Sequence, residues 1–248
     1  MTIDRLVELV AAQQPCVVLT GAGISTESGI PDFRSSGGIW AQYDPMAYAT
    51  IDAFLADPVK VWDFYGKRFD MLATTQPNDG HRALAELEQR GWVRAVITQN
   101  VDLLHERAGS RAVVEVHGSI RTSSCLDCGT ILPFDDVVRL LADEPAPACP
   151  SCGRILKPDV VMFGELLPEA AIARATQLAV QAQLLLVVGS SLEVYPVAGL
   201  TLETLASGGS LAIVNRGPTQ FDARASVTID AGAGETLRSL AEALPERP

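Results

Sequence analysis

The sequence predicts an α/β protein built on a doubly wound parallel sheet, with a small cysteine-containing module and a helical segment inserted into it. Short apolar runs alternate with longer stretches whose apolar residues recur at helical spacing. The runs are rich in Val, Ile and Leu with little polar alternation, which is typical of parallel strands buried on both faces. Strand and helix alternating along one chain indicate a parallel sheet covered by helices.

Six segments have the composition of buried strands, and four segments between them have helical spacing. Several of the helical segments finish at glycine, the residue that most often ends a helix. The predicted strands are residues 16–20, 93–98, 113–118, 184–189 and 211–215, with 226–230 as a weaker sixth, and the predicted helices are 81–91, 100–109, 168–183 and 196–209.

Two regions depart from this alternation. Residues 41–76 are mostly helical, with 57–72 as the clearest helix, and residues 121–157 hold four paired cysteines with one short helical pattern at 134–143. The second region has too little apolar material for a core of its own. We therefore predict three parts: a discontinuous Rossmann-like nucleotide-binding domain (1–40, 77–120 and 158–248), a helical insertion (41–76) and a metal-binding module (121–157).

Composition narrows the class of partner. The chain has 248 residues, 48% of them hydrophobic, and a formal net charge of −11. Such a surface repels phosphate backbones, so we expect no direct nucleic-acid partner; it either attracts basic protein segments or keeps the protein soluble. No apolar run reaches membrane-spanning length and the first residues lack a signal-peptide pattern, so we expect no membrane association and a cytoplasmic location. The oligomeric state is open, with a monomer favoured.

The cysteines predict a structural zinc site. Cys16 lies in an apolar run and is expected in the core, whereas the other four form two Cys-x-x-Cys pairs separated by twenty residues. This spacing lets four thiolates reach one ion; buried thiols or redox pairs are the alternative. Four sulfur ligands leave no open coordination position, so one zinc per chain would stabilise the module rather than take part in chemistry. The predicted ligands are Cys125, Cys128, Cys149 and Cys152.

The first predicted strand leads into a glycine-rich turn, Gly21-Ala22-Gly23, which would let backbone amides approach a pyrophosphate. The third glycine of the dehydrogenase fingerprint is replaced by Thr26, and alone such a turn is often an ordinary tight turn. It is followed by Asp32-Phe33-Arg34 on a flexible loop, which suits closure over a charged ligand. Together these segments predict nucleotide binding.

Polar residues follow several predicted strands. Gln99, Asn100 and Asp102 come after one strand and His117 after the next. Because ligands bind beyond the carboxyl ends of parallel strands, these residues and the further strand ends predict one extended cleft. Of the three histidines, His81 and His105 lie in helical patterns and are expected to be structural, so His117 is the candidate general base. The further strand-end residues are Gly189, Ser190, Ser191 and Asn215.

The motifs taken together resemble the sirtuin family of NAD⁺-dependent protein deacylases. The matching stretches, in family order over residues 16–233, are "GAGIS…SGIPDFR", "TQNVDLLH", "VHGS", the two cysteine pairs, "KPDVVMFGE", "GSSLEVYP" and "IVN".

This resemblance implies that NAD⁺ is a consumed co-substrate. The acyl oxygen of a modified lysine attacks C1′ of the ribose, and His117 then helps to deprotonate a ribose hydroxyl. Lysine, nicotinamide and O-acyl-ADP-ribose are the products. Asn100 would orient ribose hydroxyls and water, as the second catalytic residue, and Asp102 would bind the nicotinamide carboxamide. The implied NAD⁺ contacts are Gly21, Ala22, Gly23, Ile24, Ser25, Thr26, Asp32, Phe33, Arg34, Gln99, Asn100, Val101, Asp102, Gly189, Ser190, Ser191, Asn215 and Ala233.

The resemblance also implies that an acyl-lysine peptide adds as a strand between residues 160–165 and 192–194. From the residues alone, a core strand is the preferred interpretation of 160–163. Tyr65 and Arg68, three apart on a predicted helix, could jointly hold a carboxylate. Relatives that prefer succinyl- or malonyl-lysine share this pair but usually carry Thr where this chain has Asp32. The implied substrate contacts are Tyr65, Arg68, Val161, Phe163, Gly164, Glu165 and Val194.

The function predicted from the sequence is NAD-dependent protein-lysine deacetylation. The alternatives are desuccinylation or demalonylation by the same site, protein ADP-ribosyl transfer, and a binding module that holds NAD⁺ or zinc without catalysis. A dehydrogenase is disfavoured by the missing third glycine, the missing ribose-binding acid and the cysteine module.

Overall fold

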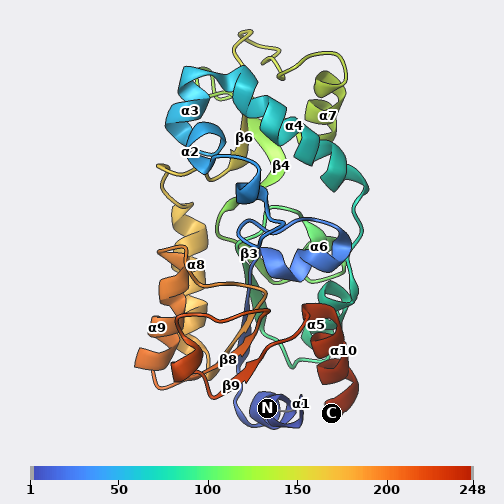
Figure 1. Cartoon of the computed structure of the whole chain (residues 1–248), viewed down its shortest axis with the longest axis vertical. Helices are drawn as coiled ribbons and strands as arrows, with labels where there is room; N and C mark the ends of the chain where they lie inside the picture. The colour runs from blue at the N-terminus through green and yellow to red at the C-terminus, as the bar shows by residue number, and fades with distance from the viewer. Residues whose placement is uncertain (1–2, 247–248) are drawn as a thin grey trace.

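The structure, a computed structural model, describes residues 3–246 and has a six-stranded parallel sheet at its centre (Figure 1). The strand order is β3-β2-β1-β7-β8-β9, and every neighbouring pair is parallel. All six predicted strands are confirmed, so the predicted doubly wound sheet is correct. Their bounds are β1 Cys16–Thr20, β2 Ala95–Thr98, β3 Val113–Glu115, β7 Leu184–Val188, β8 Ser210–Val214 and β9 Val227–Ile229.

Helices cover both faces of this sheet, because successive strand residues point to opposite sides. In β1, Cys16 and Val18 enter one apolar core, and Val17 and Leu19 enter the other. Figure 1 shows the two helical layers on either side of the strands. The first core is closed by α1 (Ile3–Ala12), α5 (Asp79–Gln89) and α10 (Ala233–Ala243), and the second by α8 (Glu169–Gln181) and α9 (Leu200–Ala206).

The helix predicted over residues 100–109 is mostly wrong. Only α6 (Leu104–Arg107) is helical, and it follows an irregular segment in which Leu103 has φ +63°. Helical spacing continues through this segment, but the Asn100 side chain donates to the Gly21 carbonyl of another strand end, and Asp102 accepts from the Leu104 amide, where the short helix begins. Short 3₁₀ helices lie between these elements: η1 (Ala22–Ser28), η2 (Ile39–Ala41), η3 (Val197–Gly199) and η4 (Asp222–Arg224).

A smaller lobe contains both predicted insertions, packed against each other (Figure 1). Trp62 and Phe69 of the helical insertion share one core with Leu132 and Leu156 of the cysteine-containing segment. The indole nitrogen of Trp62 also donates to the carbonyl of Leu156 at 2.6 Å. The elements are α2 (Pro45–Tyr48), α3 (Ile51–Ala56), α4 (Pro58–Thr74), α7 (Phe134–Leu141) and an antiparallel sheet of β5 (Ile131–Pro133), β4 (Gly118–Ser124) and β6 (Lys157–Val160).

Within residues 3–246, none of the helices combines the length and the apolar character that crossing a bilayer requires.

Candidate active site

The glycine-rich turn after β1 packs directly on the turn after β7. The amide of Gly21 donates to the Val188 carbonyl at 3.1 Å, and the amide of Gly23 donates to the Gly189 carbonyl at 2.8 Å. A Cβ on Gly23 would lie 2.7 Å from Cα of Gly189, closer than real side chains approach backbone. These glycines are therefore needed for close backbone approach, and they place the start of η1 at the carboxyl edge of the sheet.

Three predicted residues meet at this edge in one hydrogen-bonded cluster. The Asn100 amide nitrogen donates to the Gly21 carbonyl at 3.2 Å and to the Ser25 hydroxyl at 3.1 Å. Ser25 in turn donates to Asp102 at 2.7 Å. Burial raises the pKa of Asp102, against hydrogen bonds from the Leu104 amide and Ser25 that lower it. The cluster fixes an amide and a carboxyl group beside the glycine turn.

Two buried histidines lie beside this cluster. The imidazole of His81 lies 3.4 Å from the Ser25 hydroxyl, and that of His105 lies 2.9 Å from the Thr20 hydroxyl. Their rings are 4.9 Å apart. Burial lowers the pKa of His81 to about 4 and that of His105 to about 3, so both rings are neutral at pH 7. His81 was predicted at the start of a helix, and its side chain does cap α5. Its contact with Ser25 could not be predicted from the sequence.

His117 lies in the turn that follows β3, at the carboxyl edge of the sheet where it was predicted. Its orientation is fixed by Gln99, which follows the neighbouring strand β2. Nδ1 lies 3.1 Å from the Gln99 carbonyl. A carbonyl only accepts, so Nδ1 carries the proton and Nε2 keeps its lone pair. Burial lowers the pKa of His117, more than the Gln99 hydrogen bond raises it. Gln99 also donates to the Ser190 hydroxyl at 2.9 Å, which links three strand ends. The geometry supplies a neutral base near pH 7.

The loop that was predicted to close over the ligand is bonded to the segment that follows β7. Asp32 accepts hydrogen bonds from the amides of Arg34 and Ser35 at 3.0 and 2.8 Å, so its carboxylate shapes the loop. The Phe33 ring lies 5.2 Å from that of Trp40. Arg34 forms an ion pair with Glu193 at 2.9 Å. The loop therefore contacts the segment predicted to bind peptide.

Some predicted NAD⁺ contacts lie apart from the central site. Within residues 3–246 their side chains form no hydrogen bond to the residues of that site, which are Ser25, Gln99, Asn100, Asp102, His117 and Ser190. The side chain of Asn215 is half-buried and donates to the carbonyls of Arg216 and Gly217. Ala233 begins α10, whose second amide donates to Glu27 at 3.1 Å. The other members of this group are Thr26, which donates to the Gly23 carbonyl, and Ser191 after β7.

The predicted peptide segment runs from β6 to the helical insertion. The amide of Val161 donates to the His117 carbonyl at 2.8 Å. Phe163 is tied on both sides to the helical insertion, through the Ala49 carbonyl at 2.8 Å and the Ile51 amide at 3.0 Å. Val194 belongs to no strand among the described residues. The pairing of residues 192–194 with an added peptide therefore stays a prediction.

Tyr65 and Arg68 lie on one face of α4, near this segment. The Arg68 guanidinium stacks 3.5 Å from the ring centre of Phe64 and donates to its backbone carbonyl at 2.8 Å. No carboxylate pairs with Arg68 anywhere in the part of the chain described. Burial lowers the pKa of Arg68 to about 10 and raises that of Tyr65, with Glu165 close enough to add to the latter shift.

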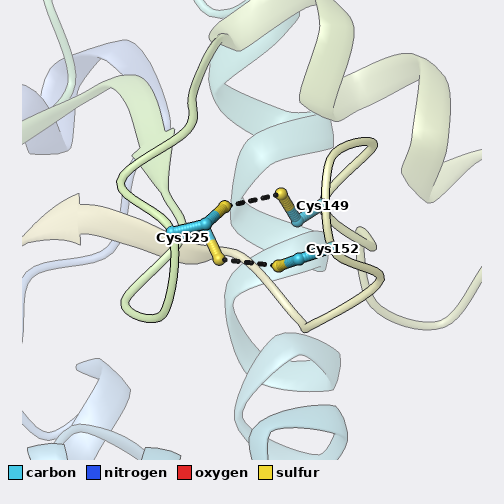
Figure 2. Close-up of side chains that lie close together, drawn as sticks. Cys125, Cys149 and Cys152 are labelled. Atoms are coloured by element: carbon cyan, nitrogen blue, oxygen red, sulfur yellow. Dashed lines mark hydrogen bonds between the residues drawn. The ribbon is translucent and has the colours of Figure 1, made fainter.

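The four paired cysteines converge in the small lobe. Figure 2 shows the side chains of Cys125, Cys149 and Cys152 pointing toward one another. Their sulfur atoms all lie within 4.8 Å of one another, with Cys125 and Cys152 3.5 Å apart. Four thiolates around a tetrahedral zinc at 2.3 Å place sulfurs about 3.8 Å apart. The donor set and its spacing fit zinc. Hydrogen bonds from Thr130 lower the pKa of Cys128.

Comparison with known proteins agrees with these features. The sequence profile described as "Sir2 family" matches residues 21–196. "NAD-dependent protein deacylase 2" of Pyrobaculum aerophilum is 46% identical, covering 98% of this chain and 96% of that protein. "NAD-dependent protein deacetylase" of Chromobacterium violaceum is 47% identical, covering 96% of each.

Solved structures are also similar to this chain. A Sir2 variant with a deacetylated p53 peptide and 3'-O-acetyl ADP-ribose superposes with a TM-score of 0.93 at 40% identity, over 98% of each chain. A Sir2 complex with p53 peptide and NAD⁺ superposes with a TM-score of 0.90, also at 40% identity and 98% of each chain. With the profile match over most of its length and relatives of this similarity, the chain belongs to the Sir2 family of sirtuins.

Proposed function

We propose that this protein is an NAD-dependent protein-lysine deacetylase, which converts acetyl-lysine and NAD⁺ into lysine, nicotinamide and O-acetyl-ADP-ribose. The observation that carries the proposal is the imidazole of His117, held by Gln99 in the neutral tautomer at the carboxyl edge of a nucleotide-binding sheet. Its relatives are named for this activity, and solved structures of similar chains hold NAD⁺ and peptide.

The residues of the candidate active site each have a proposed task. His117 takes a proton from a ribose hydroxyl at Nε2, because Nδ1 is committed to the Gln99 carbonyl. Asn100 orients ribose hydroxyls, and Asp102 receives the nicotinamide carboxamide. Phe33 shields the reacting face from water. The glycine turn accepts the pyrophosphate, while Asn215 and Ala233 receive the adenosine half.

The test is nicotinamide release from NAD⁺ in the presence and absence of an acetyl-lysine peptide. The wild type should release nicotinamide, free lysine and O-acetyl-ADP-ribose in equal amounts. Deacetylation without added NAD⁺ would contradict the proposal. Label from NAD⁺ left covalently on the protein substrate would favour ADP-ribosyl transfer instead.

A second candidate is removal of acidic acyl groups. It is favoured by Arg68, a partly buried guanidinium without a carboxylate partner in residues 3–246, beside the hydroxyl-bearing Tyr65. A succinyl or malonyl carboxylate would complete this pair. Arg68→Met should then abolish desuccinylation and leave deacetylation unchanged. Lys67→Met is the matched control, because Lys67 of the same helix forms an exposed ion pair with Asp63. Equal effects on both acyl groups would remove this candidate.

The remaining predictions belong to the same proposal. The protein acts as a monomer in the cytoplasm on acylated proteins and not on nucleic acid. One structural zinc is bound by Cys125, Cys128, Cys149 and Cys152. The chain divides at residues 41–76 and 121–157 into a nucleotide-binding domain and two insertions.

A further inference from the structure

The loop that leads from the three-stranded sheet to the peptide segment is folded around one buried ammonium group. Lys157, the first residue of β6, is 6% exposed. Its Nζ donates to the carbonyls of Pro158 and Val160, both at 3.0 Å, and pairs with a carboxylate oxygen of Glu165 at 3.0 Å. An ammonium carries three donors, so protein groups use all of them.

Glu165 closes this loop from the other end. The same carboxylate oxygen that pairs with Lys157 accepts a hydrogen bond from the Met162 amide at 2.8 Å, and the Glu165 amide donates to the Met162 carbonyl at 3.0 Å. The two ends of residues 160–165 are therefore held by one cation. Burying an ammonium costs free energy unless it is paired in this way, so the arrangement needs Glu165 as much as Lys157.

The rest of this segment is anchored elsewhere. Val161 is bonded to the His117 carbonyl, and Phe163 is bonded to the helical insertion on both sides. Beyond them Gly164 has φ +91° and Leu166 is 94% exposed. The backbone bonds to His117 and the helical insertion hold Val161 and Phe163 but not Glu165. The ion pair with Lys157 thus restrains the Glu165 end of the segment.

We propose that Lys157 is a positioning residue for the acyl-lysine peptide, which fixes residues 161–165 at a set distance from His117. The inference rests on the deacetylase function proposed above and assigns this residue within it. A preformed edge lowers the conformational entropy that the peptide must lose on binding. Since its donors are saturated, Lys157 acts through the segment and touches neither peptide nor dinucleotide. Its loss should therefore weaken peptide binding without weakening nucleotide binding.

The test compares Lys157→Met, Glu165→Gln, the double variant and the control Lys67→Met, whose ion pair is 62% exposed on its lysine side. Initial rates are measured with acetyl peptide and NAD⁺ varied in turn, and ADP-ribose affinity is measured by calorimetry. Lys157→Met should raise the peptide KM about tenfold, keep kcat within about threefold and leave the ADP-ribose Kd unchanged. The peptide KM of the double variant should be no higher than that of the more damaged single variant, because both substitutions break the same Lys157–Glu165 ion pair.

Glu165→Gln keeps a part-exposed side chain and carries the test alone if Lys157→Met does not fold. It is assayed with two acetyl peptides whose flanking residues have opposite charge. An equal rise in KM for both supports positioning, whereas a rise confined to the basic peptide means direct contact by Glu165 and overturns it. A peptide KM within twofold of wild type, or a parallel loss of ADP-ribose affinity, also overturns it. An inactive wild type would instead overturn the proposed function itself.

Discussion

The Gln99 carbonyl lies 3.1 Å from Nδ1 of His117 and so fixes which ring nitrogen is free to act as a base. His117→Ala should lower kcat for deacetylation by about 10²–10⁴-fold, because the proton acceptor is lost. ADP-ribose affinity should remain, since the imidazole makes no hydrogen bond that holds the glycine turn. Nicotinamide release and calorimetry measure the two quantities. An active His117→Ala enzyme would show that another group takes the proton.

The same histidine sets the acid limit of the rate. Burial lowers the pKa of His117 from its ordinary value of 6.5, and only the neutral ring can accept a proton. kcat/KM should therefore be independent of pH near 7 and fall only as the pH drops below 6.5. The measurement is a pH profile of kcat/KM with a peptide that does not titrate in this range. A midpoint above pH 6.5 would contradict the burial of this ring.

The two other histidines should make the fold sensitive to acid. Their folded pKa values, about 4 for His81 and about 3 for His105, lie below the unfolded value of 6.5. Between these values the unfolded chain binds more protons, so stability falls as the pH falls. From pH 7 to 5 the free energy of unfolding should drop by about 2 kcal/mol per histidine.

The variant His105→Gln should remove about half of this dependence, which denaturant unfolding at the two pH values would measure. Equal pH dependence in wild type and variant would mean that the ring is already exposed to water in the folded state.

The strand segments and the convergence of the four paired cysteines could be predicted from the sequence, because each has a local signature. Runs such as 184–188 are apolar on both faces, and two Cys-x-x-Cys pairs carry their own spacing. The contacts that build the site have no such signature. Ser25 meets Asp102 across 77 positions, and Arg34 meets Glu193 only after the sheet has brought distant strand ends together.

The glycine turn predicts a strong contrast between two alanine substitutions. A Cβ on Gly23 meets the backbone of Gly189 at 2.7 Å, and neither chain can yield without moving a strand end. Gly23→Ala should cost about 1–3 kcal/mol of stability and weaken ADP-ribose binding. Gly37→Ala is the control, because a Cβ there has no neighbour within 4 Å. Thermal unfolding and calorimetry measure both. Similar melting temperatures for the two variants would contradict this packing.

Removal of one thiolate should release the metal and loosen the small lobe. Cys128→Ser should bind less than one zinc per chain and lose about 3 kcal/mol or more of stability, or about 6–12 °C in Tm. Cys16→Ala is the control, since Cys16 lies buried in the core under the parallel sheet, away from the other four cysteines. Metal analysis and thermal unfolding check both. Full zinc content in Cys128→Ser would exclude this ligand set.

The joint packing of Trp62 and Leu156 has a consequence for anyone who would alter the acyl preference of this enzyme by grafting. If α4 were replaced by the matching helix of a homologue, the counterparts of Tyr65 and Arg68 would be introduced. The residue that replaces Trp62 would then have to pack against the native Leu156. Chimaeras should tolerate transplantation of residues 41–76 only when residues 121–157 travel with them. We therefore expect the two stretches to be exchangeable only as one unit, although the 44 residues 77–120 separate them in the chain.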